Sequence, residues 1–285
     1  MLESVTFVYQ TLTEKTYVND NYSIKDEVTW KKYVPTIETD LLLSDFEVPS
    51  AIQIIAPSEV ENETDYIGSI SDGGLYNVAI LLDTGEVMAC GSDYWGGLGI
   101  DYDTGADTNK LVTMNAVAPY DKTNAIFVAC GYGNTFILLD TGEVMGCGKN
   151  NNGELGVGDF TDRSQLVSMN ASGNYDKTNA VSISPYFYSN AILLNTGEVM
   201  FCGNNTYGQS GLGVAGTDQP ELVSMNASGN YDKTNAISVK TSTYSTYILL
   251  NTGEVMSCGR NNYGQLGIGD FTDRYELVSL NASGN

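Results

Sequence analysis

Cysteines are the most reactive residues that recur at one position of a repeated phrase in this sequence. Four of the 5 cysteines occupy the same position in a repeated Val-Met-x-Cys-Gly phrase, and these are Cys90, Cys147, Cys202 and Cys258. Histidine is absent, so neither a Ser-His-Asp or Cys-His nucleophile system nor a histidine-ligated zinc site can form. There is no C-x-x-C pair, and equivalent positions in neighbouring repeats should lie too far apart for a disulfide. We therefore expect reduced, buried thiols that pack in a core.

Two loops resemble ligand-binding motifs without completing them. Residues 101–109 space carboxylates like a calcium loop, but Gly105 occupies the fifth position and Val112 stands where a bidentate Glu is needed. The glycine-rich GRNNYGQLGIGD at 259–270 has no Lys-Ser/Thr after its glycines and precedes no helix, unlike a phosphate loop. We expect no catalytic residue, no metal site and no cofactor, and hence not an enzyme.

The charge balance limits the choice of partner. The chain has 13 basic and 35 acidic residues, a net charge of −22. Nucleic-acid binding depends on clustered Lys and Arg, so direct binding to nucleic acid or to an anionic membrane is not expected, and a basic protein is easier to accommodate. The start, MLESVTFVYQ, is unlike a signal peptide, and no apolar run could span a bilayer. We expect a soluble protein made in the cytosol.

A repeated structural unit must position these residues. Leucine doublets recur about every 56 residues, at Leu81-Leu82, Leu138-Leu139, Leu193-Leu194 and Leu249-Leu250. In the last copy, Ile248-Leu249-Leu250 is followed by a glycine-containing turn and then by Glu254 to Cys258, which is typical of a β-hairpin. One strand upstream and one downstream make four strands per unit. We therefore predict an all-β protein, a β-propeller with four visible blades.

The repeat sets the expected domain boundaries. The repeat domain covers 67–285, with blades at about 67–118, 124–174, 179–230 and 235–285. Residues 1–66 lack the repeat, and we interpret them as a β-rich N-terminal extension that acts as a cap or an assembly segment. Four blades are at the low end of the propeller range of about four to eight. Because an open edge exposes unpaired strand groups, we expect ring closure, the extension or another copy to protect the ends.

The units resemble the regulator of chromosome condensation repeat. The resemblance covers residues 67–285, and it is carried by CGYGNTFILL at 130–139 and GEVMSCGRNNYGQLGIG at 253–269. It implies a propeller, usually seven-bladed, that binds proteins; roles in the family range from nucleotide exchange on a small GTPase to ubiquitin-ligase modules and β-lactamase inhibition. The Asn-rich, almost verbatim copies also resemble those of giant DNA viruses. The chain departs from the family pattern in its cysteines, where Trp is common, and in Asn77, Asn134, Ser189 and Ser245, where the family has His.

Differences between the copies suggest a binding surface. Positions that repeat in every blade are those the blade needs to fold, whereas positions that vary can serve a partner. Variation concentrates on the inner strand and its approach, which are rich in Tyr and Phe, the residues that dominate interface hot spots. Aromatic filling of a propeller channel would give the same composition, so both interpretations stay open. The candidate protein-binding residues are Tyr76, Tyr132, Tyr186, Phe187, Tyr188 and Tyr244.

Two classes of function follow from these observations. The first is a non-enzymatic protein-interaction or structural module with a protein partner or with self-association, including a structural protein incorporated in a virus particle. The alternative is a guanine-nucleotide exchange regulator of a small GTPase. Nucleotide-release kinetics with a panel of GTPases would separate the two.

Overall fold

The structure is a computed structural model of the 285-residue chain that describes residues 70–71, 76–101 and 107–280 in full. Outside these ranges it describes the backbone of a few strands, namely β1 (Phe7–Gln10), β2 (Val18–Asn19), β3 (Tyr22–Ser23), β4 (Trp30–Tyr33) and most of β5 (Ile67–Ile70). The chain divides into two compact units, Met1–Tyr66 and Ile67–Asn285. In the first unit β1 pairs with β4 and β2 with β3, both antiparallel. The cap or assembly role of this unit stays a prediction.

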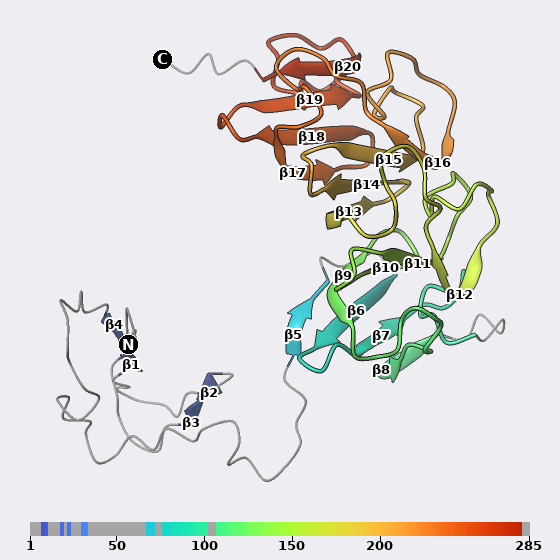
Figure 1. Ribbon diagram of the computed structural model, residues 1–285, viewed down its shortest axis with the longest axis vertical. Coiled ribbons are helices and arrows are strands. Elements are labelled where there is room, and N and C mark those ends of the chain that lie inside the picture. The colour runs from blue at the N-terminus through green and yellow to red at the C-terminus, as the bar shows by residue number, and fades with distance from the viewer. Residues whose placement is uncertain are drawn as a thin grey trace. The chain divides into compact units, whose positions relative to one another are not determined.

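Four antiparallel sheets of four strands make up the second unit (Figure 1). The first contains β5, β6 (Asn77–Leu82), β7 (Val87–Gly91) and β8 (Thr108–Thr113), and the second contains β9 (Ala125–Cys130), β10 (Asn134–Leu139), β11 (Val144–Gly148) and β12 (Arg163–Ser168). The third contains β13 (Ala180–Tyr186), β14 (Ser189–Leu194), β15 (Val199–Gly203) and β16 (Gln219–Ser224). The fourth contains β17 (Ala236–Thr241), β18 (Ser245–Leu250), β19 (Val255–Gly259) and β20 (Arg274–Ser279). The predicted all-β fold of four visible blades is confirmed.

The leucine doublets lie at the end of the second strand of each blade, as predicted, and a tight turn follows them. In the second blade the Leu139 N–H donates to Glu143 O at 2.8 Å and closes the turn into β11. Gly142 has a φ of 85°, and a Cβ at this position would lie 2.4 Å from the carbonyl of Thr178. A side chain would therefore clash with the connector that leads to the next blade, which explains why this glycine recurs.

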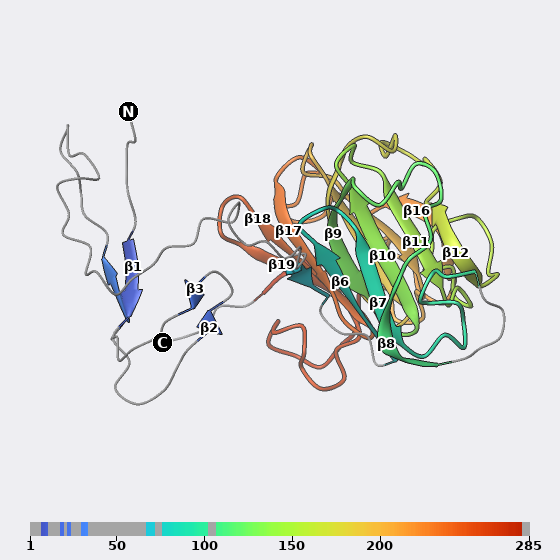
Figure 2. The same cartoon turned by 90° about the horizontal axis from the view of Figure 1, so that it is seen from below.

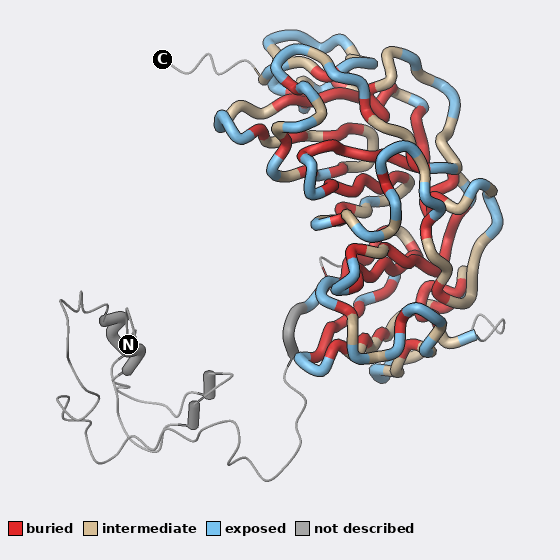
Figure 3. The backbone as a smooth tube through the Cα atoms, viewed as in Figure 1, coloured by how far each residue is buried: buried red, intermediate tan, exposed pale blue. Residues whose placement is uncertain are grey.

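The blades pack face to face, so the middle strands of the inner blades are buried on both sides (Figure 3). Residues that pair across β10 and β11, or across β14 and β15, share the volume between blades. Phe136 pairs with Gly146 in the second blade, and Ala191 pairs with Phe201 in the third. Each pair combines one large and one small residue; the large residue is on the second strand in the second blade and on the third strand in the third blade. This pairing keeps the packing density of a protein interior.

The four sheets follow one another along an arc, with the first and fourth at its two ends (Figure 1), and Figure 2 shows the same sheets from below. Ring closure was one of the three expected ways to protect the ends, and the four described blades of the second unit do not close a ring among themselves. The expectation that an incomplete ring exposes strand edges was also wrong, because blades meet through their faces. Val78 of the first blade is 38% exposed, whereas its counterpart Thr135 is 0% exposed against the first blade. An incomplete propeller thus leaves two sheet faces uncovered by neighbouring blades.

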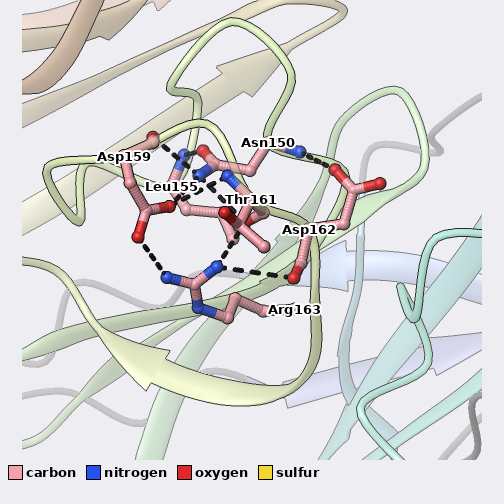
Figure 4. Close-up of polar contacts among 6 residues, drawn as sticks. All are labelled: Asn150, Leu155, Asp159, Thr161, Asp162 and Arg163. Carbon is pink, nitrogen blue, oxygen red and sulfur yellow. Dashed lines mark hydrogen bonds and ion pairs between the residues drawn. The ribbon is translucent and has the colours of Figure 1, made fainter.

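The glycine-rich loop after the third strand is held by one buried asparagine (Figure 4). The Asn150 side-chain oxygen accepts the Leu155 N–H at 2.8 Å, and its NH₂ donates to the Asp159 and Thr161 carbonyls at 2.9 and 3.1 Å. Arg163 pairs with Asp159 at 2.6 Å. Two of these bonds recur around Asn261 in the fourth blade, from the Leu266 N–H to its side-chain oxygen and from its NH₂ to the Asp270 carbonyl. These polar residues are fully used in shaping the loop.

No helix in the described part of the chain is long and apolar enough to cross a membrane.

Candidate protein-interaction surface

Two sets of turns meet at one end of every blade. The first set connects the first and second strands, and the second set follows the third strand. They come together because the second and third strands are antiparallel, so the start of one lies beside the end of the other: Asn134 pairs with Gly148, and Ser189 pairs with Gly203. Side chains from both turns of adjacent blades can therefore form one surface.

Seven aromatic rings from the four blades form a continuous surface there, and we name it the aromatic surface. Tyr132 lies at its centre, with ring-centre distances of 4.8 Å to Tyr76, 4.9 Å to Phe187 and 5.5 Å to Tyr188. These distances are typical of favourable ring–ring contacts. The members are Tyr76, Trp95, Tyr132, Phe187, Tyr188, Tyr207 and Tyr244, and Tyr186 lies beside Phe187 at 5.3 Å.

A glycine makes room for the tryptophan. Gly133 of the second blade stands where the third and fourth blades have Tyr188 and Tyr244. A Cβ on Gly133 would lie 2.4 Å from Cε3 of Trp95, and its φ is 78°. Any side chain at this position would displace the Trp95 ring, which instead fills the space and approaches Tyr132 at 5.7 Å between ring centres.

Phe187 has a backbone conformation that side chains seldom adopt. It lies in the two-residue turn between β13 and β14, with a φ of 33°. A positive φ is strained for an aromatic residue, and such strain is concentrated at binding and catalytic sites. Its ring nevertheless packs against Tyr132 and Tyr188, so the strained turn presents an aromatic ring to the surface.

Two cations from the third-strand loops lie against these rings. The Lys149 Nζ is 4.4 Å from the ring centre of Tyr132, 4.7 Å from that of Tyr188 and 5.4 Å from that of Trp95. The Arg260 guanidinium is 4.9 Å from Tyr207 and 5.4 Å from Tyr244. The ring quadrupole attracts a cation placed over its face. The aromatic surface thus holds two basic side chains of the chain itself against its rings.

Hydrogen bonding adds to the order of the surface. The hydroxyls of Tyr76 and Tyr132 are 3.0 Å apart and share one hydrogen bond. This bond is the main cause that raises the pKa of Tyr132 to about 12. Burial raises the pKa of Tyr188 as well. Tyr132 and Tyr188 therefore stay neutral at physiological pH and offer polar tips rather than charges.

A buried carboxyl lies beneath the surface in the loop that carries Lys149. Glu154 is 1% exposed, and its Oε2 accepts the Asn152 N–H at 2.8 Å. Its other oxygen, Oε1, has no hydrogen-bond partner among the described residues. Burial raises the pKa of Glu154 to about 7, against the opposing effect of backbone N–H donors and Lys149. A buried acid that ionises near neutrality is uncommon and marks this loop as a place of interest.

The structure brings together all six aromatic residues predicted from sequence. Sequence reasoning missed Trp95, Tyr207, Lys149 and Arg260, because they lie in the loop whose glycines repeat in every blade. A signal was present there: one loop position reads Ser92, Lys149, Asn204 and Arg260 in successive copies, and another reads Trp95, Asn152, Tyr207 and Tyr263. The same argument from variation between copies would have found both positions.

The cysteines serve the junctions between blades. The thiols of Cys147, Cys202 and Cys258 lie 3.6, 3.2 and 3.4 Å from main-chain carbonyls of the preceding blade, namely Gly97, Glu154 and Gln209. Burial raises the pKa of all three thiols, that of Cys258 to about 12. These three are free and buried as predicted, but Cys90 is only partly buried, because its face of the first blade is not covered by another of the described blades.

The other sequence candidates yield little. Within the described residues, no group of three or more His, Cys, Asp or Glu side chains could hold a metal ion. The calcium-like pattern at 101–109 falls mostly on residues outside the described part of the chain. The loop at 259–270 is shaped by Asn261, and its glycines close turns.

Comparison with known proteins agrees with the fold and with the repeat. The Regulator of chromosome condensation (RCC1) repeat matches residues 125–154 and 236–265. A segment of 138 residues is 31% identical to the X-linked retinitis pigmentosa GTPase regulator of the dog, and covers 48% of this chain and 13% of the dog protein. A segment of 91 residues is 32% identical to the mouse Secretion-regulating guanine nucleotide exchange factor, and covers 32% of this chain and 18% of that protein. The chain thus matches only a small part of either relative.

Solved structures also superpose on this chain. Yeast RCC1 (Prp20), in its crystal structure with Kap60, superposes with a TM-score of 0.63 at 15% identity, and the match covers 99% of this chain and 57% of that one. Human WBSCR16 gives a TM-score of 0.52 at 17% identity, over 76% of this chain and 67% of that one. At such identity the likeness concerns the fold.

Proposed function

Since the regulator of chromosome condensation (RCC1) repeat matches two segments of the chain and the chain folds into propeller blades, we propose that it is a non-enzymatic protein-interaction module whose partner binds the aromatic surface. The aromatic surface supports this proposal through its composition. Tyrosine and tryptophan are the residues that most often dominate binding energy, because they offer a large contact area with little loss of conformational entropy. Here they come from turns that vary between copies of the repeat.

The single observation that carries the proposal is the turn at Phe187. A blade needs no aromatic residue there, since the fourth blade forms the equivalent turn with Thr243. The third blade instead has the run Tyr186-Phe187-Tyr188, holds Phe187 at a φ of 33°, and leaves Tyr186 44% exposed. Strain and exposure of aromatic rings both oppose folding stability. Their joint presence is accounted for if these rings bind a partner.

The charge distribution favours a basic partner. The chain as a whole has a net charge of −22, which attracts a basic protein over distances of several ångströms. The rings of the aromatic surface already hold Lys149 and Arg260 of the chain itself. A Lys or Arg side chain of a partner can occupy the remaining exposed rings, such as Tyr76 and Tyr186, by the same cation–π attraction.

The test begins with affinity capture on the full chain and identification of the bound protein by mass spectrometry. The affinity of that protein is then compared for the wild type and the double variant Tyr186→Ala and Tyr188→Ala. We expect binding to weaken by about 2 kcal/mol or more, roughly 30-fold, with little change in melting temperature. The matched control is Phe160→Ala, an exposed ring outside the aromatic surface, and its affinity should equal that of the wild type. Equal affinity for the double variant would refute the proposal.

Nucleotide exchange on a small GTPase is the second candidate. It is supported by the match to a secretion-regulating guanine nucleotide exchange factor over 91 residues. The test is the rate of nucleotide release from a panel of GTPases, with and without the chain. An acceleration that the Tyr186 and Tyr188 double variant loses would make exchange the activity of the same surface.

A structural role in a virus particle stays a prediction from the near-verbatim, Asn-rich repeats alone. No feature of the described residues favours it. Proteomic analysis of purified particles would test it.

A further inference from the structure

The second blade differs from its neighbours at one pair of loop positions. Gln209 and Gln265 occupy the third and fourth blades where the second has Glu154. In all three blades the side-chain oxygen accepts the N–H of the residue two positions earlier, at 2.8 Å for Glu154, 3.0 Å for Gln209 and 2.9 Å for Gln265. Glu154 Oε2 therefore makes the hydrogen bond that the side-chain oxygen of glutamine makes in the other two blades. Glu154 Oε1 occupies the position of the neutral NH₂ group of that glutamine.

The partner of that amide is also replaced. In the third blade the Gln209 Nε2 donates to the Asn204 Oδ1 at 2.9 Å. In the second blade the position of Asn204 is taken by Lys149, which has no acceptor to offer through its side chain. Lys149 makes no ion pair within the described residues, and its ammonium instead lies over the rings of Tyr132, Tyr188 and Trp95. Glu154 Oε1 is thus left without a hydrogen-bond partner among the described residues, although the loop that carries it also carries Lys149.

The remaining groups around Glu154 come from both blades of the junction. Asp162 of its own loop raises its pKa. From the third blade, the Cys202 thiol donates to the Glu154 carbonyl oxygen at 3.2 Å, and Tyr188 interacts with its charge. Asp218 accepts a bond from the side chain of Asn152 at 3.0 Å. Lys149 is the only cation among these groups, so it is the one able to compensate an ionised Glu154.

We propose that Glu154 and Lys149 form a proton-controlled latch beneath the aromatic surface. With Glu154 protonated, its carboxyl mimics the glutamine of the neighbouring blades, and Lys149 stays over the rings. With Glu154 ionised, a buried and unpaired carboxylate is too costly, so the ammonium of Lys149 moves from the rings to Oε1. The rings of Tyr132, Tyr188 and Trp95 then lose their cation. This regulation rests on the proposed function of the aromatic surface, because the movement of Lys149 changes the charge next to the rings that a partner would contact.

The composition of the chain makes the latch testable without a partner. The chain has no histidine, the side chain whose ordinary pKa lies near neutral pH. Burial raises the pKa of Glu154 to about 7. The chain also has only 2 tryptophans, and Lys149 Nζ lies 5.4 Å from the ring of Trp95. The emission of Trp95, isolated by Trp30→Phe in the full chain, therefore reports on the position of the cation.

The experiment follows Trp95 emission between about pH 5 and pH 9 in this background. We expect a single transition with its midpoint near pH 7, which disappears in Glu154→Gln, the residue of the next two blades. The transition should also disappear in Lys149→Met, which keeps the carboxyl but removes the cation. Glu221→Gln, an exposed acid of the third blade, should keep it. A flat titration of the parent protein, or a transition that survives Glu154→Gln, would overturn the proposal.

This readout separates the latch from the proposed function. A transition in Trp95 emission together with unchanged partner affinity in the Tyr186 and Tyr188 double variant would leave the latch standing and refute the binding role. Weakened binding in that double variant with a flat emission titration would refute the latch and leave the binding role.

Discussion

The hydroxyl oxygen of Tyr175 accepts the backbone N–H of Val144 at 2.9 Å. Tyr175 belongs to the connector between the second and third blades, and Val144 begins the third strand of the second blade. Tyr120 and Val87 repeat this bond one blade earlier, and Tyr231 and Val199 repeat it one blade later, each at 2.9 Å. The connector thus supplies the acceptor that each strand start lacks, and it ties consecutive blades together.

Replacement of Tyr175 by Phe should destabilise the protein. The ring would still fill its site, which is 1% exposed, but the buried N–H of Val144 would lose its acceptor. A buried donor without a partner costs about 1–3 kcal/mol. Urea unfolding of the two proteins measures this loss. Tyr263→Phe is the matched control, because its ring is 77% exposed, and it should change stability by less than about 0.5 kcal/mol. Equal stability of Tyr175→Phe and the wild type would show that the ring alone holds the connector.

Glu154→Gln should stabilise the protein at pH 8 and change little at pH 4. The pKa of Glu154 is raised to about 7 in the folded state, from an ordinary value near 4.3 in the unfolded chain. The folded state therefore holds this proton more tightly, and its contribution to stability is lost as pH rises through about 7. The gain at pH 8 should be on the order of 2 kcal/mol, since pairing with Lys149 offsets part of the cost. Unfolding midpoints at the two pH values measure it, and a gain that is equal at both would contradict this assignment.

Thiol labelling should distinguish the first blade from the others. Cys147, Cys202 and Cys258 are each 0% exposed and have raised pKa values, so they should react only on unfolding. Cys90 is partly exposed and should react in native buffer. Mass spectrometry after labelling of the native protein measures the order, and Cys90→Ser should remove the fast phase. Fast labelling of all four would mean that the blade junctions open in solution.

The sequence was sufficient for the blades but not for everything they carry. Leucine doublets and glycine turns repeat with the backbone, so the strand order and the hairpins follow from local pattern. The six aromatic residues were found because the copies differ there. Lys149 and Glu154 were missed because each looks unremarkable alone. Their importance shows only when the copies are compared, because the next copy has Asn204 in place of Lys149 and Gln209 in place of Glu154. The burial of Glu154 adds to it, and only the structure shows that burial.

The ends of the array were misjudged from sequence for a related reason. Exposed strand edges were expected, yet blades contact one another through faces, so an incomplete ring leaves faces. The fourth blade differs from the third in one hydrogen bond on this face. Its Tyr247 hydroxyl donates to the Gln265 carbonyl at 2.9 Å, whereas the equivalent Gln209 carbonyl accepts from Thr246 of the following blade at 2.7 Å. The fourth blade thus satisfies within itself a carbonyl that a following blade would otherwise satisfy.

Apolar surface nevertheless remains on that face, and we predict that another copy covers it. Leu249 and Val255 are half-buried, whereas their counterparts Leu138 and Val144 are fully buried by the third blade. Exposed apolar surface of this kind favours association. The chain should therefore self-associate with rising concentration, as measured by light scattering after size exclusion, and Leu249→Glu should weaken that association. Leu111→Glu, at an exposed leucine on β8, is the control and should leave it unchanged. A wild-type chain that stays monomeric throughout would show that this face needs no second copy.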